Sequence, residues 1–270
     1  MGIGAESERE RDKRHFQRTL FDGVAGLYDA SRPGYPASVV EFVAATAGLG
    51  CGAAVLEVGC GTGQLTERLA ALGLQVMAID IGPAMIDAAR RRVGDAGVAF
   101  QVTSFEDLDA AVGSFDLVIS SAAFHWIDPD VRYRKSARLL RPSGWLALVG
   151  NEDRYDEPFG STLAGMWVAR TGIGNTGTGG AWEKPPSDPD TIAASELFGS
   201  PVLHDHTERI IRPTAEVIGV ESTRATFLSW PPDVRRGFTE EMRYRLEPRF
   251  EVHLTRHTSV TMVPVLPQAG

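Results

Sequence analysis

The chain has 270 residues, and its 35 acidic side chains outnumber its 27 lysines and arginines, giving a net charge of −8. This length suits one large domain or a domain with a cap, and the acidic balance disfavours nucleic acid as a partner. No run of eighteen apolar residues occurs, so the sequence predicts no membrane-spanning helix and no membrane partner. Residues 1–20 lack the apolar stretch of a secretory signal, and the two cysteines form no disulfide framework, so we expect a cytoplasmic protein.

Strand and helix patterns alternate along most of the chain. The residues before Pro33 are first charged and then apolar at helical spacing, and Pro33, Gly34 and Pro36 are expected to end this helical region. A further helix is expected over residues 37–47. The expected strands are 54–58, 75–79, 98–102, 115–120, 145–149, 202–211 and 250–263. The helices expected between them are 64–72, 83–93, 130–140, 159–170, 214–223 and 233–246. Residues 171–190 are rich in glycine and proline and are expected to form an exposed, mobile loop.

This alternation predicts an α/β fold. Near-continuous apolar strands separated by helices are typical of a doubly wound, mostly parallel sheet that is covered on both faces. The last helix–strand–helix–strand run would complete a seven-stranded sheet with an antiparallel edge strand. The remaining helical segments would form cap elements beside the sheet.

The most informative motif follows the first predicted strand. Its glycines are Gly59, Gly61 and Gly63, a G-x-G-x-G pattern, whereas the dinucleotide fingerprint is G-x-G-x-x-G. Glu57 precedes the first glycine by two residues, where a carboxylate would repel a pyrophosphate but would suit a ligand with an ammonium and a sulfonium. Asp80 ends the second strand, where a carboxylate accepts hydrogen bonds from ribose hydroxyls. NAD enzymes share that last feature, so Asp80 by itself indicates only a nucleoside.

The loop from Glu57 to Gly63, Asp80 and the strand beginning Phe115-Asp116-Leu117-Val118 resemble class I S-adenosylmethionine-dependent methyltransferases. The resemblance is strong over residues 55–150. Residues 28–36 resemble the corresponding segment of the small-molecule branch, which includes methyltransferase type 11 and trans-aconitate methyltransferase-like members. It implies a Rossmann-like sheet, S-adenosylmethionine as cofactor and S-adenosylhomocysteine as product.

The resemblance also implies a set of cofactor-binding residues. Glu57 and the glycine backbone would hold the methionine part, Asp80 the ribose, and Ile81 and Met85 the adenine. In the family an acid commonly bonds the adenine amino group where this chain has Ser104, and the next backbone N–H bonds a ring nitrogen. The full predicted set is Tyr28, Arg32, Glu57, Gly59, Gly61, Gly63, Asp80, Ile81, Met85, Ser104, Phe105, Glu106 and Ser121.

Candidate acceptor-side residues follow the fourth and fifth strands. His125 is the candidate catalytic residue, either as the base that takes a proton from a hydroxyl acceptor or as a positioning group. A carboxylate acceptor would need no base. The predicted substrate-binding residues are Tyr35, Trp126, Asn151 and Arg224. Asp128 is interpreted as the cap of the next helix.

These inferences predict one methyltransferase domain over residues 1–270. Residues 1–50 would form a helical lid, 51–150 the cofactor-binding half, 151–200 a cap, and 201–270 the elements that complete the sheet. The expected reaction is in-line methyl transfer to a small-molecule acceptor at oxygen, either hydroxyl or carboxylate. A non-catalytic S-adenosylmethionine-binding protein and an NAD-dependent oxidoreductase are the alternatives. No metal site is expected, and the sequence leaves monomer and homodimer open.

Overall fold

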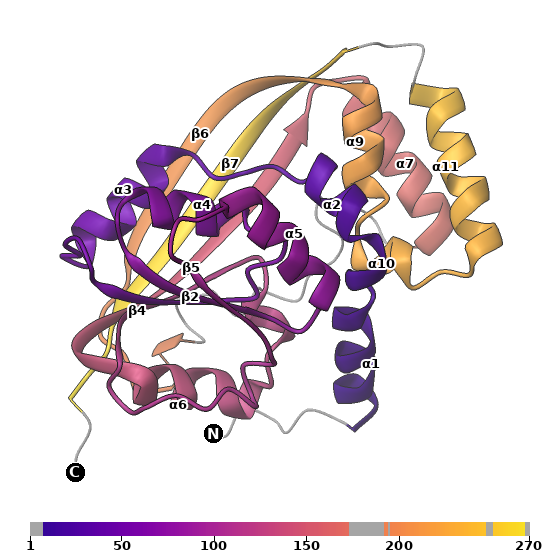
Figure 1. Cartoon of the computed structure of the whole chain (residues 1–270). Coiled ribbons are helices and arrows are strands. Elements are labelled where there is room, and N and C mark those ends of the chain that lie inside the picture. Colours follow the sequence, from indigo (N-terminus) through magenta and orange to yellow (C-terminus); the bar gives the residue numbers. More distant parts are fainter. Residues whose placement is uncertain (1–7, 173–191, 194, 247–250, 268–270) are drawn as a thin grey trace.

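The computed structural model describes residues 8–172, 192–193, 195–246 and 251–267. They form a seven-stranded sheet with the order β3-β2-β1-β4-β5-β7-β6 (Figure 1). Six strands run parallel, while β7 runs antiparallel to both neighbours and lies between β5 and the edge strand β6. The strands are β1 (Ala54–Val58), β2 (Gln75–Asp80), β3 (Ala99–Val102), β4 (Phe115–Ser121), β5 (Leu140–Tyr155), β6 (Val202–Pro213) and β7 (Glu251–Pro264). The predicted α/β class and mixed seven-stranded sheet are confirmed.

Helices follow the local signals of the sequence. Pro83 occupies the first turn of one helix, where its fixed φ is favourable and its missing N–H costs nothing. Asp128 caps another by accepting a hydrogen bond from the N–H of Asp130 at 2.9 Å, as predicted. The helices are α1 (Glu8–Thr19), η1 (Asp22–Val24), α2 (Ala25–Ser31), α3 (Ala37–Thr46), α4 (Gln64–Ala71), α5 (Pro83–Val93), η2 (Phe124–Trp126), α6 (Pro129–Leu139), α7 (Phe159–Thr171), α9 (Thr214–Glu221), α10 (Ala225–Leu228) and α11 (Pro232–Leu246).

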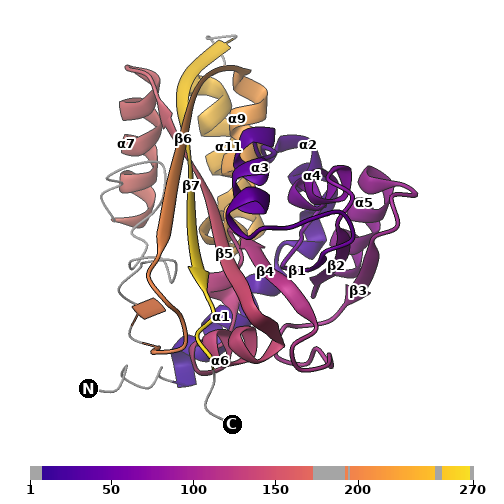
Figure 2. The same ribbon diagram turned by 90° about the vertical axis from the view of Figure 1, so that its left-hand side faces the viewer.

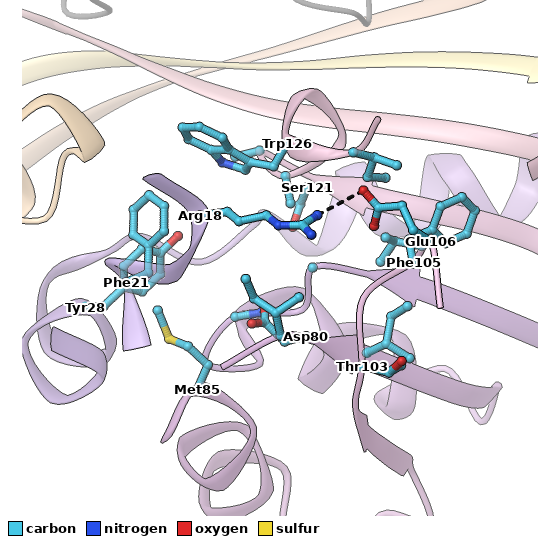
Figure 3. Close-up of a pocket in the computed structure, with 18 residues that line it drawn as sticks. Arg18, Phe21, Tyr28, Asp80, Met85, Thr103, Phe105, Glu106, Ser121 and Trp126 are labelled. Carbon is cyan, nitrogen blue, oxygen red and sulfur yellow. Dashed lines mark hydrogen bonds and ion pairs between the residues drawn. The ribbon is translucent and has the colours of Figure 1, made fainter. Parts of the chain in front are cut away.

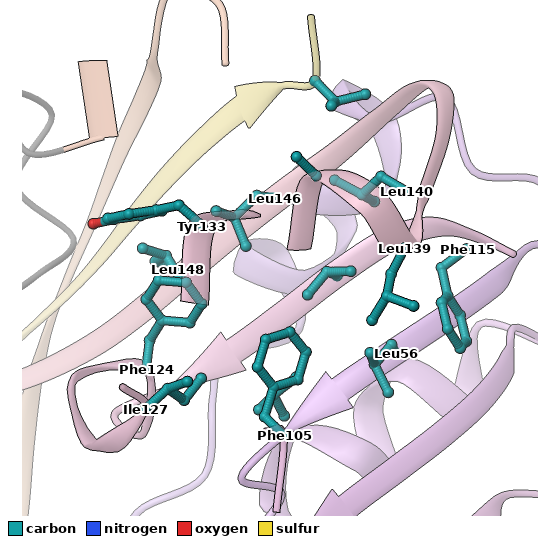
Figure 4. Packing of buried hydrophobic residues seen from close by; sticks show 14 of the residues in the cluster. Leu56, Phe105, Phe115, Phe124, Ile127, Tyr133, Leu139, Leu140, Leu146 and Leu148 are labelled. Carbon is teal, nitrogen blue, oxygen red and sulfur yellow. The ribbon is translucent and has the colours of Figure 1, made fainter. Parts of the chain in front are cut away.

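Apolar side chains cover both faces of the parallel strands. On one face, Leu56 and Val118 pack with residues of α6 and of the loop before it, including Phe124 and Tyr133 (Figure 4). On the other face, Val55 and neighbouring residues pack against α3, α4 and α5, which lie together on one side of the sheet in Figure 2. The ligand-facing loops at the strand ends therefore rest on two hydrophobic layers.

Strands β5, β6 and β7 form a long ribbon that extends beyond strands β1 to β4 (Figure 1). β5 was expected to end at Val149, but it continues to Tyr155 because β7 pairs with it as far as Leu254. Helices α7, α9 and α11 pack at this end around Trp167 and Phe238. The boundary predicted at residue 150 is therefore wrong for β5: its residues 151–155 belong to the sheet.

Two further expectations concern the rest of the chain. Residues 173–190 of the predicted loop lie outside the described residues, while Thr171 ends α7. No helix in the described part of the chain is long and apolar enough to cross a membrane.

Candidate active site

The turn between β1 and α4 depends on glycine at three positions. Gly59, Gly61 and Gly63 have φ angles of 70°, 55° and 88°, a region that L side chains rarely adopt. A Cβ atom on Gly59 would collide with the side chain of Ala123, and one on Gly63 would lie 3.0 Å from the Cα atom of Ala89 in α5. Gly59 and Gly61 line a pocket, whereas Gly63 serves the close packing of the loop against α5.

Asp80 joins the glycine turn to the loop after β2. Its Oδ2 accepts a hydrogen bond from the N–H of Gly61 at 3.0 Å, and its Oδ1 accepts one from the N–H of Gly82 at 2.9 Å. Burial raises the pKa of this carboxyl group, and the two backbone N–H groups counter that rise in pKa. Each oxygen has a second lone pair, so Asp80 can accept hydrogen bonds from a ligand in the pocket that it lines.

Glu57, in β1 two residues before Gly59, carries a fully buried carboxyl group. Neither of its oxygens has a hydrogen-bond partner among the described residues. Burial raises its pKa to about 8, an effect that Thr66 partly counters. A buried carboxyl group without donors is costly, so this position favours a ligand that brings a positive charge or N–H groups near it.

Two segments of the N-terminal helices form one wall of the pocket. Arg18 and Phe21 precede α2, and Tyr28 lies within α2; all three line the pocket (Figure 3). Asp22 fastens this wall to α5 by accepting hydrogen bonds from the N–H groups of Ala84 at 2.7 Å and Met85 at 3.3 Å. Those N–H groups belong to the first turn of α5, which has no side-chain cap from its own N-cap residue, so Asp22 caps this helix from a distant part of the chain.

The segment after β3 forms the opposite wall. Phe105 and Glu106 line the pocket together with Thr103. Arg18 reaches across from α1, and its Nη1 lies 2.9 Å from Oε1 of Glu106 (Figure 3). Ser104 does not line the pocket, and its hydroxyl donates to Oδ2 of Asp107 at 2.7 Å.

The loop after β4 completes the enclosure. Ser121, Ala122, Ala123, Trp126 and Ile127 line the pocket here. Phe21 meets both Tyr28 and Trp126 edge-on, with ring centroids 6.0 Å apart in each pair. The cavity that these residues enclose has a volume of about 110 Å³.

His125 is not one of the residues that line this pocket. Its ring centroid lies 4.5 Å from that of Trp126. Burial, with the positive charge of Arg132, lowers its pKa to about 4. The imidazole is therefore neutral at neutral pH, but it is a much weaker base than an ordinary histidine.

Comparisons with known proteins agree with this geometry. The sequence profile of the methyltransferase domain family matches residues 56–148. An uncharacterized methyltransferase of Mycobacterium tuberculosis is 32% identical over 231 residues, which cover 84% of this chain and 85% of the relative. The chain belongs to the methyltransferase family.

Other similarities are partial or concern the fold. A ubiquinone biosynthesis O-methyltransferase of Xanthomonas oryzae is 39% identical over 147 residues, half of this chain and 61% of that protein. A type II methyltransferase structure from Anaeromyxobacter dehalogenans has a TM-score of 0.62 at 22% identity, covering 88% of this chain and 99% of that one. Phosphoethanolamine N-methyltransferase 2 of Haemonchus contortus, bound to S-adenosylhomocysteine, has a TM-score of 0.55 at 19% identity, covering 93% and 60%. This methyltransferase uses S-adenosylmethionine.

The pocket of the methyltransferase fits that cofactor by its chemistry. Its apolar lining suits a base, and the open lone pairs of Asp80 suit a ribose. The orphan carboxyl group of Glu57, two residues before Gly59 of the lining, suits a cationic amino acid. The predicted residues that line it are Tyr28, Gly59, Gly61, Asp80, Ile81, Met85, Phe105, Glu106, Ser121 and Trp126.

Several predicted residues lie outside the lining. Arg32 donates to Oγ1 of Thr223 and to its carbonyl oxygen, both at 2.9 Å. Arg224 forms a two-pronged ion pair with Glu221 at 2.7 and 2.8 Å. These arginines therefore fasten α2 and α10 to the region around α9. Glu57, Gly63, Ser104 and His125 take the places described above.

Asn151 and Tyr35 hold the segment that follows α2. Asn151 lies within β5 rather than after it, and its Nδ2 donates to the carbonyl oxygen of Gly34 at 3.2 Å. Its Oδ1 accepts from the hydroxyl of Thr258 at 2.6 Å. The buried hydroxyl of Tyr35 hydrogen-bonds Ser121, which lines the pocket. Neither of these two predicted substrate residues lines the pocket.

Sequence reasoning missed part of the lining. The missed residues are Arg18, Phe21, Val58, Ile79, Thr103, Ala122, Ala123 and Ile127. Val58, Ile79 and Thr103 adjoin strand ends, so their place next to the predicted motifs was an available signal. No local pattern marks Arg18, because its partner Glu106 lies 88 residues away.

Proposed function

We propose that this S-adenosylmethionine-dependent methyltransferase methylates an oxygen of a small-molecule acceptor, and that the lined pocket is its cofactor site. In this arrangement Gly59 and Gly61 accommodate the methionine part above the carboxyl group of Glu57. Asp80 accepts hydrogen bonds from the ribose hydroxyls, and Ile81 and Met85 pack on the adenine. The cofactor supplies an activated methyl group, so the protein has to align the acceptor and exclude water.

The ionisable groups of the lining carry the inference about the acceptor. Among the described residues they are Arg18, Tyr28, Asp80 and Glu106. Arg18 and Glu106 pair with each other, and Asp80 is committed to backbone N–H groups and, in this proposal, to the ribose. Among the described residues, the lining therefore offers no uncommitted carboxylate and no imidazole to take a proton, so it favours an acceptor that is already ionised. A carboxylate fulfils this condition, whereas an alcohol would need its proton removed.

His125 then acts as a positioning residue. Its low pKa of about 4 makes it a poor general base at neutral pH, and its contact with Trp126 supports the aromatic wall. The partial likeness to an O-methyltransferase supports transfer to oxygen. The rings of Phe21, Tyr28 and Trp126 favour an acceptor with an apolar or aromatic body.

The test is a panel of acceptors with methyl-labelled S-adenosylmethionine. Carboxylic acids with apolar or aromatic bodies, matched phenols, alcohols and amines would be compared by release of S-adenosylhomocysteine and by base lability of the labelled product. We expect base-labile methyl esters from the carboxylic acids. Labelled product from amines alone would refute transfer to oxygen. Cofactor binding without release of S-adenosylhomocysteine across the panel would favour the non-catalytic alternative.

A further inference from the structure

The outer edge of the sheet, on the side away from β3, is a long and regular strand. Among the described residues β6 has one strand neighbour, β7, and the two pair from Val202 to Pro213 at a constant offset without a bulge (Figure 1). Soluble proteins usually shorten such an edge or interrupt it with proline, lysine or a bulge, because its backbone groups can pair with another strand. β6 has no lysine, and its one proline, Pro213, is its last residue. This edge is therefore suited to strand addition.

The side chains of β6 alternate between two faces of the sheet. One face is partly covered by α3, where the ring of Phe42 stacks on that of His204 with centroids 4.1 Å apart. The odd-numbered positions from 203 to 211 are all exposed. In chain order this exposed row consists of Leu203, Asp205, Thr207, Arg209 and Ile211.

The exposed row is complementary to its own reverse. If two copies of β6 pair antiparallel about Thr207, Asp205 of each copy lies opposite Arg209 of the other, and Leu203 lies opposite Ile211. Leu203 and Ile211 are 59% and 56% exposed, so each would gain an apolar neighbour. Opposite charges and apolar side chains that face each other across two strands stabilise their pairing. A two-fold axis repeats every such pair, so each contact forms twice.

The other face of β6 and the alternative registers favour the same centre. Pairing about Thr207 also places His206 opposite Glu208 of the second copy, a donor opposite a carboxylate. Centring the pair on Asp205, Glu208 or Arg209 would instead place two identical charges opposite each other, which is destabilising. Centring it on His206 would separate the carboxylate of Asp205 from the guanidinium group of Arg209.

Arg209 is already oriented on the exposed face. Its Nη1 and Nη2 donate to the carboxylate of Asp156 at 2.9 and 2.6 Å, and Nη1 also donates to the hydroxyl of Thr255 at 2.9 Å. A guanidinium group carries five N–H donors, so the group keeps donors for a second carboxylate. Asp205 of a second copy would supply that carboxylate.

We propose that two copies of this chain associate through β6, antiparallel about Thr207, so that one sheet continues across both protomers. The partner is a second copy because the charges and apolar residues of the row match the same row reversed. β6 contributes no residue to the pocket lining. The association is therefore independent of the proposed function, and it leaves one pocket in each protomer.

Charge reversal tests the interface, with sedimentation velocity over a concentration series as the measurement. The wild-type chain should sediment with twice the mass of one chain. Asp205→Arg and Arg209→Asp each place like charges opposite each other, so each should weaken association roughly 10–100-fold. An equimolar mixture of the two variants should recover it, because both pairs then combine opposite charges again. Asp87→Arg, the same change of charge at an exposed position of α5, is the matched control and should leave association unchanged.

A cysteine at the two-fold axis tests the register. Residues directly opposite in an antiparallel pair have Cα atoms about 4.5–5.5 Å apart, a distance that a disulfide spans. Thr207→Cys should therefore form a disulfide-linked dimer under mild oxidation, in a Cys51→Ser background because Cys51 is exposed. Ser259→Cys is the control: Ser259 is exposed on β7 opposite Asp205. It would lie at least about 14 Å from its copy, three strand spacings away, and should not cross-link.

The outcomes decide the proposal without reference to cofactor binding. A wild-type chain that stays monomeric up to about 200 μM, where even a weak specific interface would be populated, overturns it. A dimer that Asp205→Arg leaves unchanged also overturns it, because that dimer uses another face. Loss of association that the mixture of variants does not recover, together with no cross-link at Thr207→Cys, overturns the register.

Discussion

The replacement Asp80→Ala tests the cofactor site most directly. Asp80 is the acceptor proposed for the ribose, and its two oxygens also hold the N–H groups of Gly61 and Gly82. Removing it deletes a charge-assisted hydrogen bond to the ribose worth about 1.5–3 kcal/mol, and 1.4 kcal/mol corresponds to a tenfold change in affinity. We therefore expect the affinity for S-adenosylhomocysteine to fall roughly 10–150-fold, with a further loss if the glycine turn moves.

Isothermal titration calorimetry of the wild-type and variant chains measures this change. Asp87→Ala is the matched control, because Asp87 is an exposed acid on α5 that pairs only loosely with Arg90, at 3.5 Å. It should leave the affinity within about twofold of wild type. Since burial raises the pKa of Asp80, wild-type affinity should also fall on acidification at a higher pH than for an ordinary aspartate. Unchanged affinity in Asp80→Ala would show that the ribose does not bind at the end of β2.

Three other predictions follow from the buried groups of the site. The fold raises the pKa of Glu57 to about 8, so protonation of this carboxyl group stabilises the unliganded protein at low pH. The free energy of unfolding should therefore fall as the pH rises from about 4.5 to 8. Thermal melts of the Glu57→Gln variant should lack this dependence on pH. Gly59→Ala should destabilise the fold by about 1–3 kcal/mol through the clash with Ala123, whereas Gly26→Ala, which meets nothing within 4 Å in α2, should be neutral or slightly stabilising in denaturant titrations. His125→Ala should leave cofactor binding unchanged. If the imidazole only positions its neighbours, the pH profile of the methyl-transfer rate should have the same inflections in the wild type and in the variant. An inflection that disappears in the variant would instead support His125 as the general base.

The length of β5 shows where local patterns stop being informative. The apolar run ends at Val149, so the sequence predicted the strand to end there. The strand continues because its polar residues find partners on β7: Asp153 binds Arg256 at 2.6 and 2.7 Å, and Asn151 binds Thr258. Polar residues are tolerated in a strand when their hydrogen bonds are satisfied, and only the neighbouring strand decides that.

The roles of the two arginines near α2 and α10 illustrate the same limit. Arg32 was expected among the cofactor-binding residues, but it binds Thr223, 191 residues further along the chain. Arg224 was expected on the acceptor side and instead neutralises Glu221, which is almost fully buried. The sequence identifies a guanidinium group as a potential anion partner, but it does not identify which acid or carbonyl is nearest in space.

The sequence by itself determined the order of strands and helices over residues 54–139 of this methyltransferase, the glycine turn and the place of Asp80 at the end of β2. These features are local, because a strand end, its turn and the next helix are continuous in the chain and carry their own periodicity and backbone requirements. Only the tertiary structure decided how the pocket is closed. It joins Arg18 to Glu106 across 88 residues and Asp22 to the first turn of α5 across 62. Such contacts depend on how the N-terminal helices pack beside the sheet, and no spacing in the sequence encodes that packing.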